Sequence, residues 1–248
     1  MALLNIKSSL YDPSNRLVSW GERGVQDEKN CCNWQGIRCS NDSFHVISID
    51  LRNIQLENYK FEQEENNKIE QEESLILSKP PNTMLQGTIS PSLSNITHLE
   101  YLDLGYNDFQ ESDIPFQFSV LSKLVHLDLS FSNILPSSPN KFTNLSSLRY
   151  LDLSCHGYFI GRTSCLQTST IEWVGGLVNL RVLKLSGISL YEATTSGQES
   201  LDEHILYLSN LRVLDLSYCD IVSPTFLNQF HNLSRLSSLK MNQNVILT

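Results

Sequence analysis

Apolar residues recur along the chain in a short rhythm that repeats about every two dozen positions. The rhythm is Leu-x-x-Leu-x-Leu, and it begins at Val46, Leu99, Leu124, Leu148, Leu180, Leu211 and Leu236. From the second start onward the spacings are 25, 24, 32, 31 and 25 residues. Alternate side chains of a strand point to opposite faces, so the leucines would face inward and the residues between them outward. The pattern therefore predicts a short strand at each of the seven places.

A spacing of 24 or 25 residues lies within the range of leucine-rich repeats, which is about 20–29 residues. The longer spacings then indicate loop insertions. One repeat cannot bury its leucines alone, whereas stacked repeats can, in a solenoid with a continuous parallel sheet. The alternative is an α/β protein with helices between its strands, but the intervening segments are too short and too rich in Ser, Asn and Pro. We predict an α/β solenoid, a right-handed leucine-rich-repeat horseshoe with a concave parallel sheet.

The turn after each strand needs a polar side chain that bonds its backbone. Asn107 and Asn244 fill this position well, Ser132, His156 and Cys219 fill it less well, and Ile188 cannot fill it. We therefore expect the turn after Leu185 to be satisfied in a different way.

The segment before the repeats predicts a cap, with residues 1–45 as cap and 46–248 as repeats. Apolar residues at its start suit a short amphipathic helix that ends at Asp12-Pro13, because proline disfavours a helical residue before it. This helix contains Leu3, Leu4, Ile6, Lys7 and Leu10. The tryptophan-bearing segments RLVSW and CCNWQGIRC follow, and they can cover leucines that the first repeat would otherwise expose.

Residues 57–84 interrupt the first repeat with seven Glu and three Lys. Their lack of apolar periodicity predicts a solvated loop. It is either a variable insertion, which costs little loop-closure entropy, or an island that docks a ligand or partner. We favour the insertion.

The net charge of −9 argues against a nucleic-acid binder, which needs a basic face. An apolar content of 40% supports a packed core, and no run reaches the roughly 18 apolar residues of a membrane span. The first ten residues, MALLNIKSSL, also lack the features of a secretory leader.

The chain has no nucleophile elbow, phosphate loop, zinc-protease or kinase motif, so we expect no enzyme activity and no cofactor. Asp103, Asp128, Asp152 and Asp215 share one position of the repeat, which Lys184 and Lys240 occupy elsewhere. We interpret this column as a solvated acidic stripe rather than a catalytic carboxylate pair. A zinc site at Cys31, Cys32, Cys39 and His45 lacks paired C-x-x-C spacing, so we expect no metal.

The segment ALLNIKSSLYDPSNRLVSW with CCNWQGIRC resembles the plant-type N-terminal cap of extracellular leucine-rich-repeat receptors. The segment LQGTISPSLSNITHLEYLDLGYNDF resembles the plant-specific repeat, whose L-x-G-x-I-P element builds a second sheet. That element is clear only around Leu85–Pro91 and partial at Ile114-Pro115, so an irregular second sheet is expected. IEWVGGLVNLRVLKLSGISL and LSNLRVLDLSYCDI resemble receptor-like proteins of plant surface immunity, which have repeats and a membrane anchor but no kinase.

The resemblance implies a disulfide between Cys32 and Cys39. In this cap the first cysteine of the CC pair joins one just upstream of the helix, a partner that Cys31 lacks in this sequence. Together with the missing leader, and with the repeats stopping at KMNQNVILT without a C-terminal cap, this leads us to expect a shortened chain.

Two further features bear on the secretory pathway. Cys155 and Cys165 bracket an insertion and could staple it, whereas Cys219 is expected to be a small buried residue. Sequons at Asn41, Asn95, Asn144 and Asn232 are compatible with glycosylation, although composition alone would give about four.

The resemblance implies the ligand-binding ectodomain of a plant receptor-like protein at the extracellular face of the plasma membrane, acting in pathogen or peptide perception and defence signalling. It would bind a peptide, protein or glycan and recruit a co-receptor or adaptor kinase. The alternatives are a secreted inhibitor of pathogen cell-wall-degrading enzymes and a truncated gene product without function. The expected concave-face positions are Tyr101, Asp103, Tyr106, His126, Asp128, Phe131, Tyr150, Asp152, Lys184, Asp215 and Tyr218. The large aromatic residues among them are either exposed interface anchors or covers for neighbouring backbone.

Overall fold

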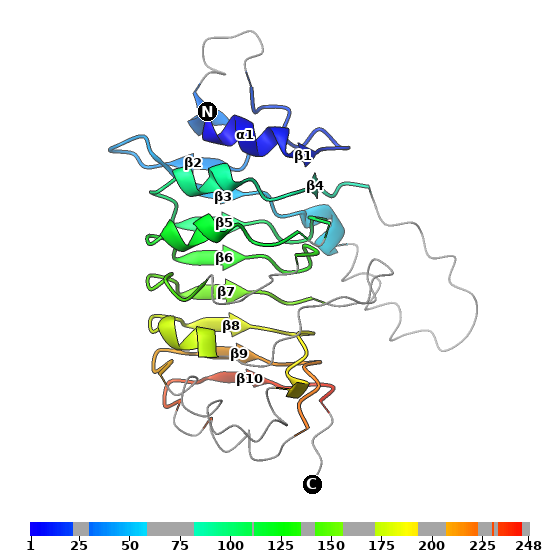
Figure 1. Cartoon of the computed structure of the whole chain (residues 1–248), viewed down its shortest axis with the longest axis vertical. Helices are drawn as coiled ribbons and strands as arrows, with labels where there is room; N and C mark the ends of the chain where they lie inside the picture. Colours follow the sequence, from blue (N-terminus) through cyan, green and yellow to red (C-terminus); the bar gives the residue numbers. More distant parts are fainter. Residues whose placement is uncertain are drawn as a thin grey trace, which may run out of the picture.

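The protein is a stack of short parallel strands with a helical cap at its N-terminal end (Figure 1). The computed structural model describes residues 1–21, 30–58, 82–110, 112–134, 142–155, 172–192, 207–222, 230 and 233–244. Eight strands form one sheet in the order β2-β3-β5-β6-β7-β8-β9-β10. All neighbours are parallel except β2 and β3, which pair antiparallel, so the last strand of the cap continues the sheet of the repeats.

Each of the seven predicted strands is present, joined by β2 of the cap, and the solenoid is confirmed. The strands are β2 (Ile37–Cys39), β3 (Val46–Asp50), β5 (Tyr101–Asp103), β6 (His126–Asp128), β7 (Tyr150–Asp152), β8 (Val182–Lys184), β9 (Val213–Asp215) and β10 (Ser238–Lys240). Their central leucines are in register from β5 to β10. Four of them, from Leu102 on β5 to Leu183 on β8, are at most 1% exposed, whereas Leu239 on β10 is 42% exposed. The stacked leucines therefore make a single core that runs along the solenoid.

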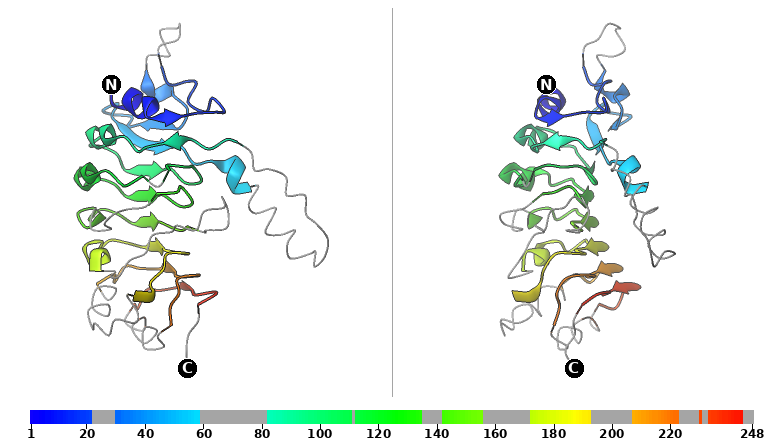
Figure 2. Two further views of the ribbon diagram at one scale, coloured as in Figure 1. Left: turned by 45° about the vertical axis from the view of Figure 1, so that its right-hand side comes forward. Right: turned by 90° about the vertical axis from the view of Figure 1, so that its right-hand side faces the viewer.

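Short 3-10 helices close the repeats on the side away from the strands (Figure 2). They are η3 (Pro91–Asn95), η4 (Phe116–Val120) and η6 (Glu172–Gly176). Each sends a buried side chain inward, as Leu93, Phe118 and Trp173 do. These side chains fill the space between the sheet and the short 3-10 helices.

The cap helix α1 (Ala2–Ser8) ends earlier than predicted. The Ser9 hydroxyl donates to the carbonyl of Ile6, and the next residues become strand β1 (Leu10–Tyr11) instead of continuing the helix to Asp12. Strand β1 pairs antiparallel with β4 (Gln86–Gly87). Gly87 has φ +121°, and a Cβ there would lie 2.4 Å from the carbonyl oxygen of Ser9, so this pairing requires glycine.

Two tryptophans seal the first repeat, as predicted. Trp20 and Trp34 stack with ring centroids 5.8 Å apart, and both are buried. The indole nitrogen of Trp20 donates to the carbonyl of Gln35 at 2.8 Å, so its polar atom is satisfied in the core. Among the described residues, the second sheet continues beyond β4 as isolated bridges, Gln86 with Asp108 and Ser112 with Ile134. Its irregularity is thereby confirmed.

The turn position behaves as predicted at its two asparagines. Asn107 is fully buried, and its amide nitrogen donates to the carbonyls of Leu51 and Leu104 at 2.9 Å. Its side-chain oxygen accepts from the amide of Leu85 at 3.0 Å. Asn244 plays the same part in the last described rung, where it donates to Leu216 and Met241.

Ser132 and Cys219 fill the turn position with fewer bonds to the turn, and Ile188 fills it through its backbone alone. The hydroxyl of Ser132 donates to the carbonyl of Leu129, and the thiol of Cys219 contacts the carbonyl of Leu185 at 3.2 Å. Ile188 is buried, and its backbone amide closes the turn by donating to Leu185 at 2.9 Å. His156 lies outside the described residues, as does most of the acidic insertion. In the parts of the chain that are described, no helix has the length and apolar character needed to cross a membrane.

Candidate ligand-binding face

The solvent side of the large sheet, here called the concave face, carries two columns of side chains. The first strand position holds Tyr101, His126, Tyr150, Val182, Val213 and Ser238, and the third holds Asp103, Asp128, Asp152, Lys184, Asp215 and Lys240. Because the strands are parallel and in register, neighbours in each column are one strand spacing apart, about 4.8 Å. The expected positions on the strands therefore do share one surface.

Three rings of the first column form a stacked ladder. His126 lies between Tyr101 and Tyr150, with centroids 4.2 and 4.1 Å away and planes within 13° of parallel. The ammonium group of Lys184 lies 5.3 Å from the centroid of the Tyr150 ring and 3.0 Å from its hydroxyl. Both faces of the imidazole are thus occupied by this protein's own rings.

The acidic column is buried, so its interpretation as a solvated stripe was wrong. Asp103, Asp128 and Asp152 are only 3%, 2% and 4% exposed. Each carboxylate accepts a hydrogen bond from the backbone amide of the residue two positions later, at 2.9–3.0 Å. Asp215 makes the same bond to Ser217 but stays partly exposed. These aspartates close the turns after their strands, a role that the Leu-x-Leu pattern does not reveal.

Arg52 supplies the positive charge that faces these carboxylates. Its Nη1 donates to Oδ2 of Asp128 at 2.8 Å and lies 3.4 Å from Oδ2 of Asp103. Its Nε and Nη2 bind both oxygens of Glu57 at 2.8 Å, and the guanidinium lies 4.9 Å from the centroid of the Tyr106 ring. Glu57 belongs to a helical turn at residues 54–58, where the acidic insertion begins. Arg52 therefore joins the start of the insertion to the sheet.

Sequence analysis missed Arg52 and Glu57. Their five-residue separation carries no motif, and the partners on the sheet lie 51 and 76 positions away. Only the stacking of the repeats brings these groups together.

Burial governs the protonation of the cluster. Burial, followed by repulsion from Asp128, raises the pKa of Asp103 to about 6, and burial raises the pKa of Asp128 as well. Burial, with the nearby Arg52 charge, lowers the pKa of His126 to about 4, so its imidazole is neutral near pH 7. Its Nε2 is buried and has no hydrogen-bond partner among the described residues. The hydrogen bond with Glu57 raises the pKa of Arg52, which keeps the guanidinium charged.

The aromatic residues of the turns differ in exposure. Tyr106, Phe131 and Tyr218 occupy equivalent turns with φ of 57°, 52° and 58°. Tyr106 is only 5% exposed, so the expectation of an exposed anchor there was wrong. Its ring packs 4.9 Å from that of Phe131 and beneath Arg52. Tyr218 is 46% exposed, which makes it the accessible member of this set.

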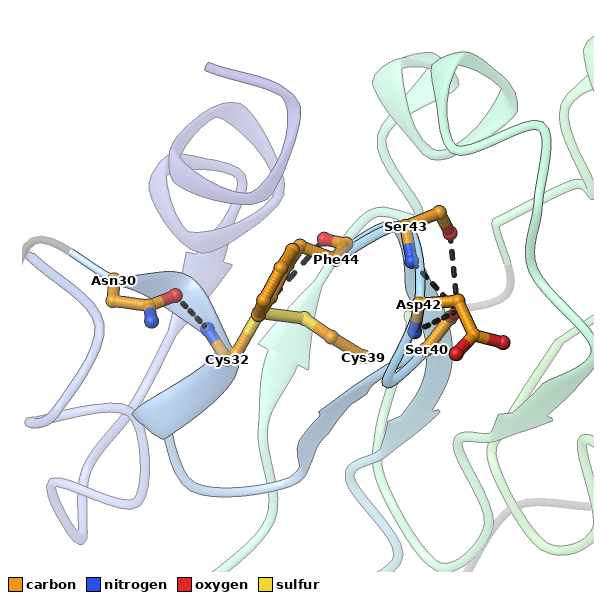
Figure 3. Close-up of a disulfide and its surroundings, with 7 residues drawn as sticks. All are labelled: Asn30, Cys32, Cys39, Ser40, Asp42, Ser43 and Phe44. Atoms are coloured by element: carbon orange, nitrogen blue, oxygen red, sulfur yellow. Dashed lines mark hydrogen bonds between the residues drawn. A yellow bond between two sulfur atoms is a disulfide. The ribbon is translucent and has the colours of Figure 1, made fainter.

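The Cys32–Cys39 disulfide is confirmed, with Cα atoms 5.5 Å apart (Figure 3). Asn30 accepts a hydrogen bond from the amide of Cys32, which fixes the short helix η2 (Cys31–Asn33) on one side of the bridge. The hydroxyl oxygen of Ser40 accepts from the amides of residues 42 and 43 on the other side. The bridge therefore ties η2 to strand β2 and to the turn that follows it.

The other cysteines divide into free and bonded residues. Cys31 is a partly exposed free thiol, and Cys219 is free and fully buried, as predicted. Burial raises the pKa of the Cys219 thiol to about 12, which makes it unreactive. Cys155 is disulfide-bonded, and its expected partner Cys165 lies outside the described residues.

Two groups of potential metal ligands occur in the described ranges. Cys31, Cys32 and Cys39 lie together, but the disulfide uses two of the three sulfurs. Ligand atoms of Asp103, His126 and Asp128 lie within 4.8 Å of one another. Both carboxylates already pair with the guanidinium of Arg52, at 3.4 and 2.8 Å.

The sequons remain predictions. Asn41, Asn95 and Asn144 are exposed, so a glycan could reach them, and Asn95 lies at the end of η3 on the side opposite the strands. Asn232 lies outside the described residues.

Comparisons with known proteins agree with this geometry. Residues 1–40 match the family described as leucine rich repeat N-terminal domain, and residues 95–112 and 207–223 match the leucine rich repeat family. The chain therefore has the leucine-rich-repeat fold, with an N-terminal segment that matches the repeat cap family. Its curated relatives include plant receptor-like proteins, among them Receptor-like protein EIX1 of Solanum lycopersicum, 34% identical over 220 residues. That match covers 89% of this chain but only 18% of the relative.

Solved structures share the fold. The crystal structure of PEPR1-AtPEP1 superposes with a TM-score of 0.60 at 22% identity, covering 98% of this chain and 31% of that one. The plant peptide hormone receptor RGFR1 in complex with RGF2 gives a TM-score of 0.54 at 25% identity, covering 85% and 29%. Both are leucine-rich-repeat ectodomains, and nothing in the family or the fold points to catalysis.

Proposed function

We propose that this chain is a non-catalytic ligand-binding segment of a plant cell-surface receptor-like protein that perceives a peptide or a pathogen-derived molecule in defence signalling. The observation that carries the proposal is the concave face, a single in-register surface contributed by successive strands. A rigid array of this kind spreads contacts over many repeats, so selectivity comes from its solvent-side residues. The relationship to receptor-like proteins and to a peptide hormone receptor supports this choice.

The two halves of the face would contribute differently. On β5 to β7 the large side chains are already engaged, since the rings stack on one another and the aspartates bond their own turns. On β8 and β9 the first column narrows to Val182 and Val213, beside the exposed ring of Tyr218. We assign ligand contact chiefly to β8–β10 and a supporting role to the buried cluster around Arg52.

The extracellular setting is part of the proposal. The disulfide between Cys32 and Cys39 is typical of proteins that fold in an oxidising compartment. Exposed sequons suit the same pathway. A co-receptor or adaptor kinase would then transmit the signal, because receptor-like proteins of this kind lack a kinase of their own. The division into a cap at 1–45 and repeats at 46–248 is proposed on the same basis.

Photo-cross-linking tests the proposed binding face. Benzoylphenylalanine is placed at Tyr218 on the concave side or at Phe116, which is 74% exposed on η4, on the opposite side. The proteins are secreted from plant cells and incubated with extracellular fluid from healthy and infected tissue. A saturable adduct that forms from Tyr218 and not from Phe116 is expected. Equal labelling from both positions, or no saturable adduct from Tyr218, would refute a binding function for this face.

A further inference from the structure

Three exposed arginines line the edge of the concave face at which the strands begin. Arg149, Arg181 and Arg212 each stand one residue before β7, β8 and β9. Their backbones are directly joined, since the amide of Arg181 donates to the carbonyl of Arg149 and the amide of Arg212 to that of Arg181, both at 2.8 Å. The three side chains therefore leave the protein one strand spacing apart, about 4.8 Å.

None of these guanidinium groups has a hydrogen bond or an ion pair with any residue in the described ranges. They differ in this from Arg16, which donates to Asn107 and backbone carbonyls, and from Arg52 with its three carboxylates. Like charges one strand apart repel each other, so the column is unfavourable in the free protein unless solvent or a ligand screens it.

The charge along this edge runs against the composition of the chain. In this column the neighbours of the three arginines are Val125 before β6 and Ser237 before β10, and exposed Glu100 takes the equivalent place before β5. Exposed Lys123 and Arg235 lie on the other side of the first leucine of their repeats. The residues on either side of that leucine in the repeats of β6 to β10 include five cations and no carboxylate. Over the whole chain acidic residues outnumber basic ones, 27 to 18, so this stretch of the edge differs in sign from the net charge.

A purely structural role for the arginines is the alternative. Arginine stems can lie along apolar surface while the head stays in water. That role needs only the methylene groups of the arginine side chain, so a methionine at the same position would serve it equally well. It gives no reason for unpaired guanidinium groups to line up on consecutive strands.

We propose that Arg149, Arg181 and Arg212 form an anion-binding edge that docks an extended acidic segment of a peptide ligand. The inference rests on the proposed function and gives the ligand a chemical class. Guanidinium binds carboxylate through two parallel hydrogen bonds, which is stronger and more directional than binding by an ammonium group.

The dimensions suit an extended peptide. In an extended chain, alternate side chains lie on one face about 6.7 Å apart. The three Cα atoms span two strand spacings, about 9.6 Å, so two carboxylates at i and i+2 fall within the column. Neighbouring Val182 and Val213 are small and leave room beside the arginines for the peptide backbone.

Fluorescence anisotropy with a labelled probe tests the proposal. The probe is an acetylated peptide of four Glu-Gly repeats, and its Gln-Gly analogue is the neutral control. Variant Arg181→Met keeps the apolar stem and removes the charge, and Arg181→Gln repeats the test with a polar side chain. The matched variant is Arg38→Met, which removes one exposed arginine from strand β2 of the cap.

The glutamate peptide should bind the unaltered chain at least tenfold more tightly than the glutamine peptide. Arg181→Met should lower its affinity five- to tenfold, Arg38→Met less than twofold, and the triple methionine variant should abolish binding with unchanged thermal unfolding. No binding, or equal loss in Arg181→Met and Arg38→Met, would overturn the proposal. Tighter arginine-dependent binding of polygalacturonate than of the peptide would overturn the peptide assignment.

These outcomes are independent of the cross-linking result. A saturable adduct from Tyr218 without arginine dependence would leave the proposed function standing and reject the anion-binding edge. Arginine-dependent peptide binding without that adduct would support the anion-binding edge and reject ligand contact around Tyr218.

Discussion

The Nη1 atom of Arg52 lies 2.8 Å from Oδ2 of Asp128, although the two residues are 76 positions apart in the chain. Through this contact a residue two positions after β3 reaches across β5 to the end of β6. The other side of the guanidinium holds Glu57, at the start of the acidic insertion. One side chain thus connects the first repeat, the insertion and the buried carboxylates of the concave face.

Replacing Arg52 by methionine should therefore lower the free energy of unfolding. It leaves the buried carboxylates of Asp103 and Asp128 without a cation, and loss of one partner from a buried ion pair destabilises by about 3–5 kcal/mol. Because Arg52 is 21% exposed, we expect the lower end of that range in urea unfolding. Adding Asp128→Asn should recover part of the loss. A change within about 0.5 kcal/mol, the level of an ordinary surface substitution, would show that the cluster has no structural role.

The stacked imidazole should make stability depend on pH. The pKa of His126 is lowered to about 4, so its contribution is present above the unfolded value of 6.5 and is lost as pH falls toward 4. Asp103 acts in the opposite sense, because its raised pKa makes the folded state bind a proton more tightly below about pH 6. Tyr101, Tyr150, Arg52, Lys184 and Asp152 face the imidazole and set its environment.

The variant His126→Phe keeps a stacked ring and removes the titration. Between pH 7 and pH 4.5 it should lose less stability than the unaltered protein, by about 1–2 kcal/mol after allowance for partial exposure. Thermal unfolding at pH 4.5, 5.5 and 7 measures this difference. Parallel pH profiles for the two proteins would mean that the imidazole is as well solvated folded as unfolded.

Replacing the turn residues should lower the free energy of unfolding by different amounts. Asn107→Ala leaves the buried amide of Leu85 and the carbonyl of Leu104 without their partner, which should cost about 2–4 kcal/mol. Ser132→Ala removes a single hydroxyl bond to Leu129 and should cost about 1 kcal/mol. Chemical denaturation of both variants compares them directly. Equal costs would contradict the multiple bonds assigned to Asn107.

Removal of the cap disulfide should act locally. The double variant Cys32→Ser, Cys39→Ser opens an eight-residue loop, for which the chain-entropy estimate gives a loss of about 2–3 kcal/mol. Hydrogen exchange should rise first in η2 and β2 and leave β6 to β9 protected. Uniform loss of protection along the solenoid would mean that cap and repeats unfold as one unit.

The repeat rhythm was sufficient to predict β3 and β5 to β10, because inward leucines at fixed spacing are a property of the sequence itself. It did not predict β1 and β2 of the cap. The tryptophan cap and the asparagine turns could likewise be predicted from local chemistry. The end of α1 could not, since it depends on strand pairing with Gly87, far along the chain. Burial of the aspartates was missed for a related reason. Whether a carboxylate faces water depends on the rings and the guanidinium that neighbouring repeats place over it.

A glycan placed on each face gives the most direct test of the concave face as the ligand-binding surface. Val213→Asn with Asp215→Ser creates a glycosylation site on β9, and Val120→Asn creates one with Ser122 on η4, where Val120 is 53% exposed. Each secreted variant is titrated with the species cross-linked from Tyr218. We predict that the β9 glycan reduces affinity at least a hundredfold and that the η4 glycan changes it less than twofold. Full affinity in the presence of the β9 glycan would contradict ligand binding at the concave face.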